Sequence, residues 1–211
     1  SIETGKLMTL AVLPFTEEAG QAAAAATALL ETLQPAMCLA IERGELNAAG
    51  RIHNMGGKDT SATQAKVDYL FQLAGARGVK TLAVGDGGNE IGMANISEAI
   101  RDNVAFGDAC CCPCGLGIAP ATPVDLLVAA TISNWGCYAI AALLLAACGK
   151  PELLHAADRE ERLLRSAAAA GFHDAIYGGV EWSVDGCALP AHLAMVTLMK
   201  EAVEQGLKRY N

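Results

Sequence analysis

Residues 81–93 read TLAVGDGGNEIGM, a β-branched and apolar run that passes directly into a glycine-rich turn. Such a run, bounded by glycines and followed by a helix-compatible stretch, is typical of a strand, a turn and a helix. The glycines, which let the backbone turn tightly and approach a ligand closely, are Gly85, Gly87 and Gly88. The polar side chains of the turn are those of Asp86, Asn89 and Glu90. Dehydrating or hydrolytic chemistry, or a hard metal ion, would use two carboxylates and an amide grouped in this way.

This turn does not match the common nucleotide-binding loops. The dinucleotide pattern G-x-G-x-x-G requires glycine at position 90, where the chain has Glu90, and no Gly-Lys-Ser/Thr follows as in a Walker loop. A phosphate tail would also meet the carboxylates of Asp86 and Glu90 unless a cation lay between them. Two interpretations therefore remain, a tight turn with solvated acids and a functional site.

The composition is typical of a compact α/β protein and excludes two classes of partner. Of the 211 residues, 53% are hydrophobic and 18% are charged, which is sufficient for a substantial core in a single domain spanning residues 1–211. The 15 basic and 23 acidic residues give a net charge of −8, which argues against nucleic acid and anionic membranes as partners. The most apolar stretch is uninterrupted only over residues 137–148, too short to span a bilayer. With no signal segment at the start, we expect a cytoplasmic protein.

Apolar strands alternate with helices along the chain. The pattern predicts strands over Leu7–Leu13, Ala36–Ile41, Thr81–Val84 and Asp125–Ile132. It predicts helices over Glu17–Leu33, Ser61–Ala74 (opened by a capping box), Asn89–Asn103 and Pro151–Ala169, and one that follows the polar break Ser133–Gly136 and runs to Cys148. A hairpin over Trp182–Leu189 and a last helix from Pro190 complete the prediction. This alternation predicts an α/β fold, a mostly parallel, doubly wound sheet with helices on both faces.

Three of the predicted strands end in polar residues. The first of these runs into Glu42-Arg43, the second into the turn at Asp86, and the third into Ser133-Asn134. In open α/β sheets the ligand crevice lies outside the carboxyl ends of the strands. We therefore expect these side chains, which are scattered over ninety residues of sequence, to lie in one shared cleft.

The eight cysteines fall into two kinds. Four of them lie in apolar runs and read as reduced core residues, namely Cys38, Cys137, Cys148 and Cys187. The other four form the run CCCPC at residues 110–114. Consecutive cysteines cannot all face one ion, and no second CxxC pair or nearby histidine accompanies them, which favours a small-residue loop over a thiol or metal site. His53 reads as a loop residue in preference to a ligand, since no second histidine stands at helical or hairpin spacing from it.

Four segments together resemble the C-terminal domain of the D-glutamate cyclase family. They are IERGELNAAGRIHNMGGKD (residues 41–59), GDGGNEIGM (85–93), VDLLVAATISNWGCYAI (124–140) and GGVEWSVDGCALPAHLAMVTLM (178–199). The GDGGNEIGM and SNWG elements are the specific ones. The chain lacks a match to the family's further N-terminal stretch, so that segment is expected to be missing, and residues 110–123 look longer and richer in cysteine than their counterpart.

The resemblance implies a lyase that cyclises D-glutamate to 5-oxo-D-proline with loss of water. The substrate would be D-glutamate or a related small acid, and a homo-oligomer is left open. The wider family also implies an alternative, a manganese-dependent phosphohydrolase. The missing N-terminal motifs make a non-catalytic domain that binds a small ligand a third interpretation.

The implied reaction suggests roles for the polar residues. An amine must lose a proton and a carboxylate must be polarised, which requires a base together with an acid or a metal. As a hypothesis, Glu42, Asp86 and Glu90, with Asp59, hold Mg²⁺ or Mn²⁺; without metal, one of these acids is the base. The catalytic set is Glu42, Asp86, Asn89 and Glu90. The substrate-binding set is Arg43, Asn54, Gly87, Gly88, Ser133 and Asn134, with Arg43 as carboxylate clamp and Asn89 and Asn134 as oxyanion donors.

Some of these residues have simpler interpretations. Glu42 and Arg43 could form a surface ion pair. Asp59 could favour a nearby helix start instead of binding metal. Gly87 and Gly88 could serve only the conformation of the backbone.

Overall fold

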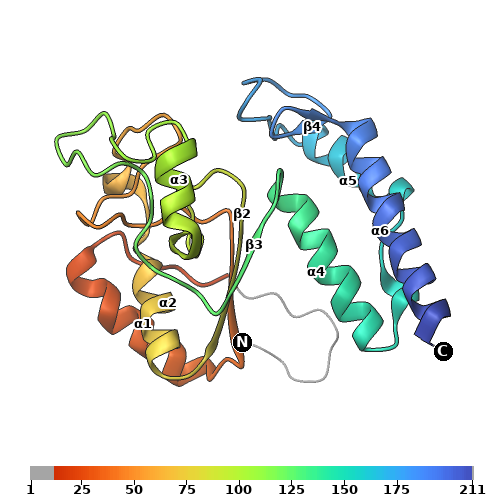
Figure 1. Ribbon diagram of the computed structural model, residues 1–211, viewed down its shortest axis with the longest axis horizontal. Coiled ribbons are helices and arrows are strands. Elements are labelled where there is room, and N and C mark those ends of the chain that lie inside the picture. Colours follow the sequence, from red (N-terminus) through yellow and green to blue (C-terminus); the bar gives the residue numbers. More distant parts are fainter. Residues whose placement is uncertain (1–11, 211) are drawn as a thin grey trace. The chain divides into compact units, whose positions relative to one another are not determined.

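The computed structural model describes residues 12–210, which contain six helices and five strands (Figure 1). The helices are α1 (Ala19–Leu33), α2 (Asp68–Ala76), α3 (Ser97–Asn103), α4 (Ser133–Ala147), α5 (Ala157–Ala169) and α6 (Leu189–Tyr210). The strands are β1 (Met37–Ile41), β2 (Lys80–Gly85), β3 (Leu126–Ala129), β4 (Ser183–Val184) and β5 (Cys187–Ala188).

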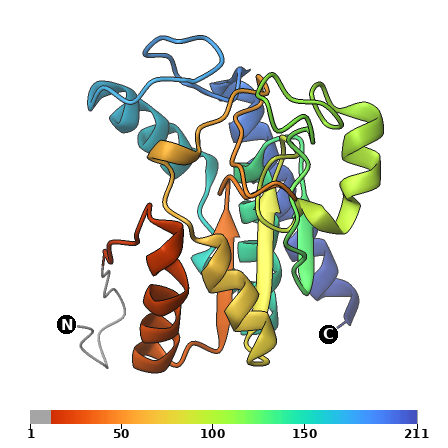
Figure 2. The same ribbon diagram turned by 90° about the vertical axis from the view of Figure 1, so that its left-hand side faces the viewer.

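The first three strands form a parallel sheet in the order β1-β2-β3, with β2 in the centre (Figure 2). The other two form the antiparallel hairpin that precedes the last helix. The predicted α/β class is thus confirmed. Of the strand predicted over Leu7–Leu13, residues 7–11 lie outside the described residues, and residues 12 and 13 are not in a strand. Because β1 and β2 are parallel neighbours, their carboxyl ends lie at the same edge of the sheet.

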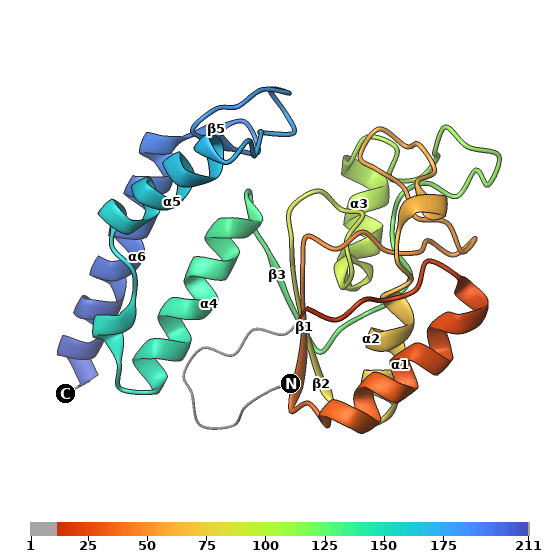
Figure 3. The ribbon, with the colours of Figure 1, turned by 180° about the vertical axis from the view of Figure 1, so that it is seen from behind.

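The contacts divide the chain into two compact units. Within the described residues, the first unit contains residues 12–83 and 87–127, and the second contains residues 84–86 and 128–210. In the first unit α1 packs against α2, and in the second α6 packs against both α4 and α5 (Figure 3). The prediction of one domain over residues 1–211 stays a prediction.

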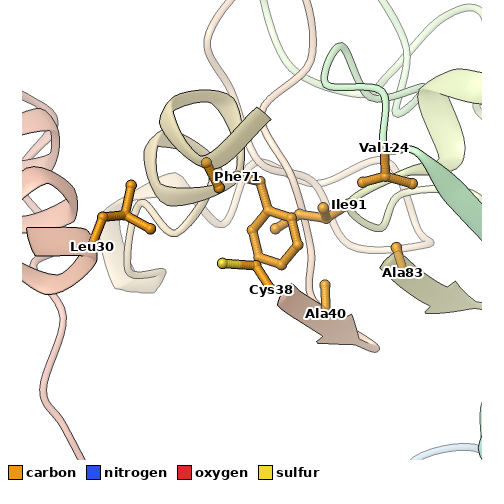
Figure 4. Close-up of a cluster of buried hydrophobic side chains, with 8 residues drawn as sticks. Leu30, Cys38, Ala40, Phe71, Ala83, Ile91 and Val124 are labelled. Carbon is orange, nitrogen blue, oxygen red and sulfur yellow. The ribbon is translucent and has the colours of Figure 1, made fainter. Parts of the chain in front are cut away.

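The core of the first unit lies between its helices and the sheet. Leu30 of α1, Phe71 of α2 and Cys38 of β1 meet there (Figure 4). The other buried members of this cluster are Ala40, Ala74, Ala83, Ile91 and Val124. Ile91 comes from the glycine-rich turn itself, so the turn is anchored in the core. This burial fixes the position of the residues on either side of it.

Strand β1 corrects one detail of the sequence analysis. Its apolar run predicts burial on both faces, but the strand alternates, with Cys38 and Ala40 buried. The side chains of Met37, Leu39 and Ile41 are 48%, 47% and 49% exposed.

Three predicted helices begin later than the sequence pattern indicates. The capping box at Ser61 opens only a 3₁₀ turn over Ser61–Thr63, because the Ser61 hydroxyl accepts the N–H of Ile52 at 2.8 Å and does not cap a helix. The helix that follows begins at Asp68. The other two are likewise preceded by 3₁₀ turns, over Met93–Ile96 before α3 and over Pro151–Leu153 before α5.

Gly92 shows how closely the turn packs on the sheet. Its φ of 90° lies in the left-handed region, which favours glycine. A Cβ atom there would lie 2.6 Å from the Cβ of Ala83 and 2.8 Å from a methyl carbon of Val124. Only a residue without a side chain lets the turn rest on β2 and on the segment entering β3.

We predict that Gly92→Ala lowers the free energy of unfolding by about 2 kcal/mol or more, because the added methyl group clashes and the backbone is strained. The matched control is Gly75→Ala in α2, where a Cβ atom would meet nothing within 4 Å. That variant is expected to be neutral or more stable by about 0.5–1 kcal/mol. Urea denaturation of both variants provides the measurement. Equal stability of the two would contradict the packing described for Gly92.

Two buried acids hold the long loops of the first unit together. Glu45, which is 1% exposed, accepts the N–H of Thr122, and Asp68, which is 0% exposed, accepts the N–H of Leu46 at 2.7 Å. The second carboxyl oxygen of each has no hydrogen-bond partner. Burial raises the pKa of both acids, that of Glu45 to about 8. With a pKa of about 8, the carboxyl group of Glu45 is protonated at neutral pH.

The raised pKa of Glu45 predicts a pH-dependent stability. The folded chain holds a proton up to about pH 8 that the unfolded chain releases near its ordinary pKa of 4.5. The stabilisation is therefore complete below about pH 4.5 and is lost as the pH rises towards 8, at a rate on the order of 1 kcal/mol per pH unit.

We expect Glu45→Gln, which imitates the protonated acid, to flatten this dependence and to stabilise the chain at pH 8. Chemical denaturation of the wild type and of Glu45→Gln at several pH values between 5 and 8 tests this expectation. The matched control is Glu98→Gln, which removes an exposed carboxylate on α3 and is expected to keep the wild-type slope. A slope in Glu45→Gln equal to that of the wild type would disprove the assignment.

Candidate functional site

The segments that follow β1 and β2 pair with each other through their backbones. Gly44 and Glu90 form an antiparallel bridge. The N–H of Ile91 donates to the carbonyl of Arg43 at 2.8 Å, and the N–H of Glu45 donates to that of Asn89 at 2.9 Å. This pairing brings together two polar segments that are more than forty residues apart in the sequence.

An acidic group forms at this edge of the sheet. Glu42, Asp86 and Glu90 each offer one carboxylate oxygen, and these oxygens all lie within 4.8 Å of one another. Asp86 is joined directly to Gly87, so its place beside Glu90 follows from the turn. The structure therefore brings together three of the four acids predicted as metal ligands. Oxygen donors of this kind suit Mg²⁺ or Mn²⁺.

Glu90 is the buried member of this acidic group, at 4% exposure. Its two oxygens accept the N–H groups of Gly87 at 2.7 Å and Gly88 at 2.6 Å. A Cβ atom at Gly87 would lie 2.7 Å from the sulfur of Met55, and Gly88 has a φ of 110°. The two glycines thus shape the turn around the carboxylate.

Asp86 is held within the second unit by the start of α4. Its Oδ2 accepts the N–H of Ser133 at 2.8 Å, and Ser133 is fully buried. An N–H at a helix N-terminus favours a negative charge, so this bond stabilises the carboxylate. Asn134 is the next residue of the same helix. The substrate-binding roles of Ser133 and Asn134 stay predictions.

Two predicted amides make structural hydrogen bonds. The Nδ2 of Asn89 donates to the carbonyl of His53 at 2.7 Å, which ties the glycine-rich turn to the loop after β1. The Oδ1 of Asn54 accepts the N–H groups of Gly56 at 3.1 Å and Lys58 at 3.0 Å, and so closes its own loop. Neither bond tests the catalytic role of Asn89 or the substrate-binding role of Asn54.

Arg43 and Asp59 are engaged with neighbours in the same loop region. The guanidinium group of Arg43 donates to the side-chain oxygen of Gln64 at 2.8 Å and to the carbonyl of Ala65. Asp59 accepts the N–H of Ser61 at 2.8 Å and lies 3.5 Å from Arg51. The bonds from Ser61 hold the pKa of Asp59 below its ordinary value. Asp59 belongs to neither of the groups of three or more potential metal ligands found among residues 12–210.

A second group of potential ligands was missed by the sequence analysis. His53 and the cysteines Cys110, Cys112 and Cys114 offer ligand atoms that all lie within 4.8 Å of one another. The expectation that no histidine lies near these cysteines is therefore wrong, since His53 is nearly sixty residues away in sequence but adjacent in space. The available signal was the spacing of the cysteines, because alternate residues of an extended segment can share one side.

A hollow of about 670 Å³ lies elsewhere, within the second unit. Its lining includes Arg165, Tyr177 and Trp182, and the guanidinium carbon of Arg165 lies 3.7 Å from the centre of the Trp182 ring. None of the predicted site residues lines it. The hollow and the acidic group have no residue in common.

No helix within residues 12–210 combines the length and the apolar character needed to cross a bilayer. The expected cytoplasmic location stays a prediction.

Two comparisons with known proteins bear on this site. The family described as "D-glutamate cyclase-like, C-terminal" matches residues 3–200. The human protein named "D-glutamate cyclase, mitochondrial" is 36% identical over 108 residues, a stretch that covers 50% of this chain and 16% of the human protein. The matching stretch thus covers only a small part of the human protein. The family match extends over nearly the whole chain, and the chain therefore belongs to the D-glutamate cyclase-like C-terminal family.

Proposed function

We propose that the acidic group at the ends of β1 and β2 is the active site of a D-glutamate cyclase-like lyase. Its reaction would be the intramolecular dehydration of D-glutamate to 5-oxo-D-proline. Membership of the family and the name of the human relative support the reaction class. The observation that carries the proposal is the convergence of Glu42, Asp86 and Glu90 within 4.8 Å.

The three acids fit a divalent metal. Carboxylates this close repel one another unless a proton or a cation lies among them. Their donors are all oxygen atoms, the ligands that Mg²⁺ and Mn²⁺ prefer. When bound, such an ion would polarise the γ-carboxylate of the substrate as a Lewis acid.

The chain's own residues would manage the proton and the substrate. The α-amine attacks the γ-carboxyl carbon, a C–N bond forms, and a carboxyl oxygen leaves as water. Glu42 is the exposed member of the acidic group, so we assign to it the removal of the amine proton. The hydrogen bonds of the Arg43 guanidinium group go to the neutral oxygens of Gln64 and Ala65, and we assign to this group the attraction of the substrate's α-carboxylate. The side-chain amides of Asn89 and Asn134 are the proposed donors to the oxyanion.

The direct test is the formation of 5-oxo-D-proline from D-glutamate with Mg²⁺ or Mn²⁺, followed by chiral liquid chromatography and mass spectrometry. We expect Glu42→Gln and Asp86→Asn to lower kcat/KM at least about tenfold, because each removes a charge from the acidic group. The matched control is Asp102→Asn, which removes an exposed carboxylate on α3 that belongs to neither ligand group. It is expected to keep wild-type activity.

Unchanged turnover in Asp86→Asn would remove the acidic group from the reaction. If the wild-type chain forms no 5-oxoproline, the cyclase proposal is wrong. In that event, release of phosphate from a simple phosphomonoester would indicate the phosphohydrolase, and a rise in Tm with D-glutamate would indicate a binding domain.

A further inference from the structure

The cysteine-rich segment forms a loop with a narrow neck in the first unit. The N–H of Ile118 donates to the carbonyl of Phe106 at 2.9 Å. A Cβ atom at Gly117 would lie only 2.1 Å from the carbonyl oxygen of Gly107, so the backbones of the two segments that form the neck are in direct contact at these glycines. The loop between these glycines contains all four cysteines of the run. Backbone contacts alone therefore fix the two ends of this loop.

Alternate cysteines of this loop point to one place. The sulfur of Cys110 lies 3.3 Å from that of Cys112 and 3.3 Å from that of Cys114. Cys111, between the first two, is exposed and its thiol is directed to the carbonyl of Gly56, at 3.7 Å. Consecutive cysteines indeed cannot share one ion, but residues at i, i+2 and i+4 can.

His53 completes the group from a different loop. It is 2% exposed, and its Nε2 lies 3.2 Å from the sulfur of Cys112 and 3.7 Å from that of Cys114. In a tetrahedral zinc site, metal–ligand distances of about 2.3 Å to sulfur and about 2.0 Å to nitrogen place neighbouring ligand atoms about 3.5–3.8 Å apart. The four separations given above lie within about half an ångström of those values, and all six are below 4.8 Å.

We propose that His53, Cys110, Cys112 and Cys114 form a structural Zn²⁺ site. Three thiols and one imidazole are a ligand set of tetrahedral zinc, and four protein ligands leave no position open for a substrate. Soft sulfur donors also exclude the hard ions that suit the acidic group. The two ligand groups of this chain are therefore selective for different metals.

Hydrogen bonds to sulfur support the assignment. The Nδ2 of Asn47 donates to the sulfur of Cys114 at 3.5 Å, and the N–H of Cys114 donates to the sulfur of Cys112 at 3.4 Å. Asn47 is 3% exposed, and its Nδ2 also donates to the carbonyl of Gly117 at 2.8 Å. Such donors stabilise the thiolates that a metal requires and orient them.

The position of the site indicates what the metal would hold. His53 lies in the loop after β1, and the cysteines lie in the loop before β3, so one ion would clamp two long segments of irregular backbone. The N–H of Cys111 also donates to the carbonyl of Gly57 at 2.9 Å, between the same two loops. The carbonyl of His53 accepts the amide of Asn89, which connects the clamp to the turn that carries Glu90. Zinc would in this way stabilise the scaffold of the acidic group without touching its substrate.

The test begins with the metal content of the intact chain. The protein, purified under reducing conditions and dialysed, is expected to contain about one zinc ion per chain, measured by inductively coupled plasma mass spectrometry. Replacement by Co²⁺ should produce the visible bands of a tetrahedral ion and the near-ultraviolet charge-transfer band of cobalt–thiolate bonds. Cys112→Ser and His53→Ala should each lower metal affinity at least about tenfold. Cys111→Ser, the matched control, should bind as the wild type does.

A measurement on the wild type covers the case in which these variants do not fold. Brief alkylation followed by peptide mass spectrometry should modify Cys111 and spare the other three cysteines of the loop until a strong zinc chelator is added. The chelator should also lower the Tm, and Zn²⁺ but not Mg²⁺ should restore it. A reduced wild-type chain that binds neither Zn²⁺ nor Co²⁺ would overturn the proposal, as would equal alkylation of all four thiols with and without chelator.

Discussion

The backbone pairing between residues 43–45 and 89–91 is the contact on which the candidate site depends. Two strands of a parallel sheet end beside each other, and without further contacts the segments that leave them would diverge. The bonds from Ile91 to Arg43 and from Glu45 to Asn89 hold the segments together. Because Ile91 is also buried in the core, the pairing is anchored to the sheet. Glu42 and Glu90 are neighbours for this reason.

Buried polar groups, more than regular secondary structure, organise the loops around this pairing. A buried carboxyl group is costly unless it is hydrogen-bonded or protonated. Glu45 and Asp68 each accept a backbone N–H from a loop. Burial raises the pKa of both acids, that of Glu45 to about 8, so Glu45 keeps its proton at neutral pH. Asn47 and the His53–cysteine group likewise connect two loops, the loop after β1 and the cysteine loop. The first unit thus combines a small sheet with long loops that are fixed by specific polar contacts.

The sequence analysis was most accurate where a local pattern determines the structure. The strands β1 and β2 and the helix α1 lie within one or two residues of their predicted positions, since apolar runs and strong breakers mark them. Helix α4 already begins at Ser133, within the residues interpreted as a polar break before it. The capping box at Ser61 misled because its hydroxyl is used by Ile52, a residue outside the predicted helix. The prediction that no histidine lies near the cysteine run was wrong because His53 comes from another loop. The spacing of residues within one segment does not show which distant residue will pack against it.

The residues alone determined the α/β class, the family and the glycine-rich turn with its acids, because each of these follows from short-range pattern or from matched motifs. Only the tertiary structure decided which acids meet, which cysteines face one another and which histidine joins them. Such groupings depend on how loops from separate strands are pinned to each other, through buried hydrogen bonds and close glycine contacts. These long-range contacts link residues whose separation along the chain carries no periodic signal.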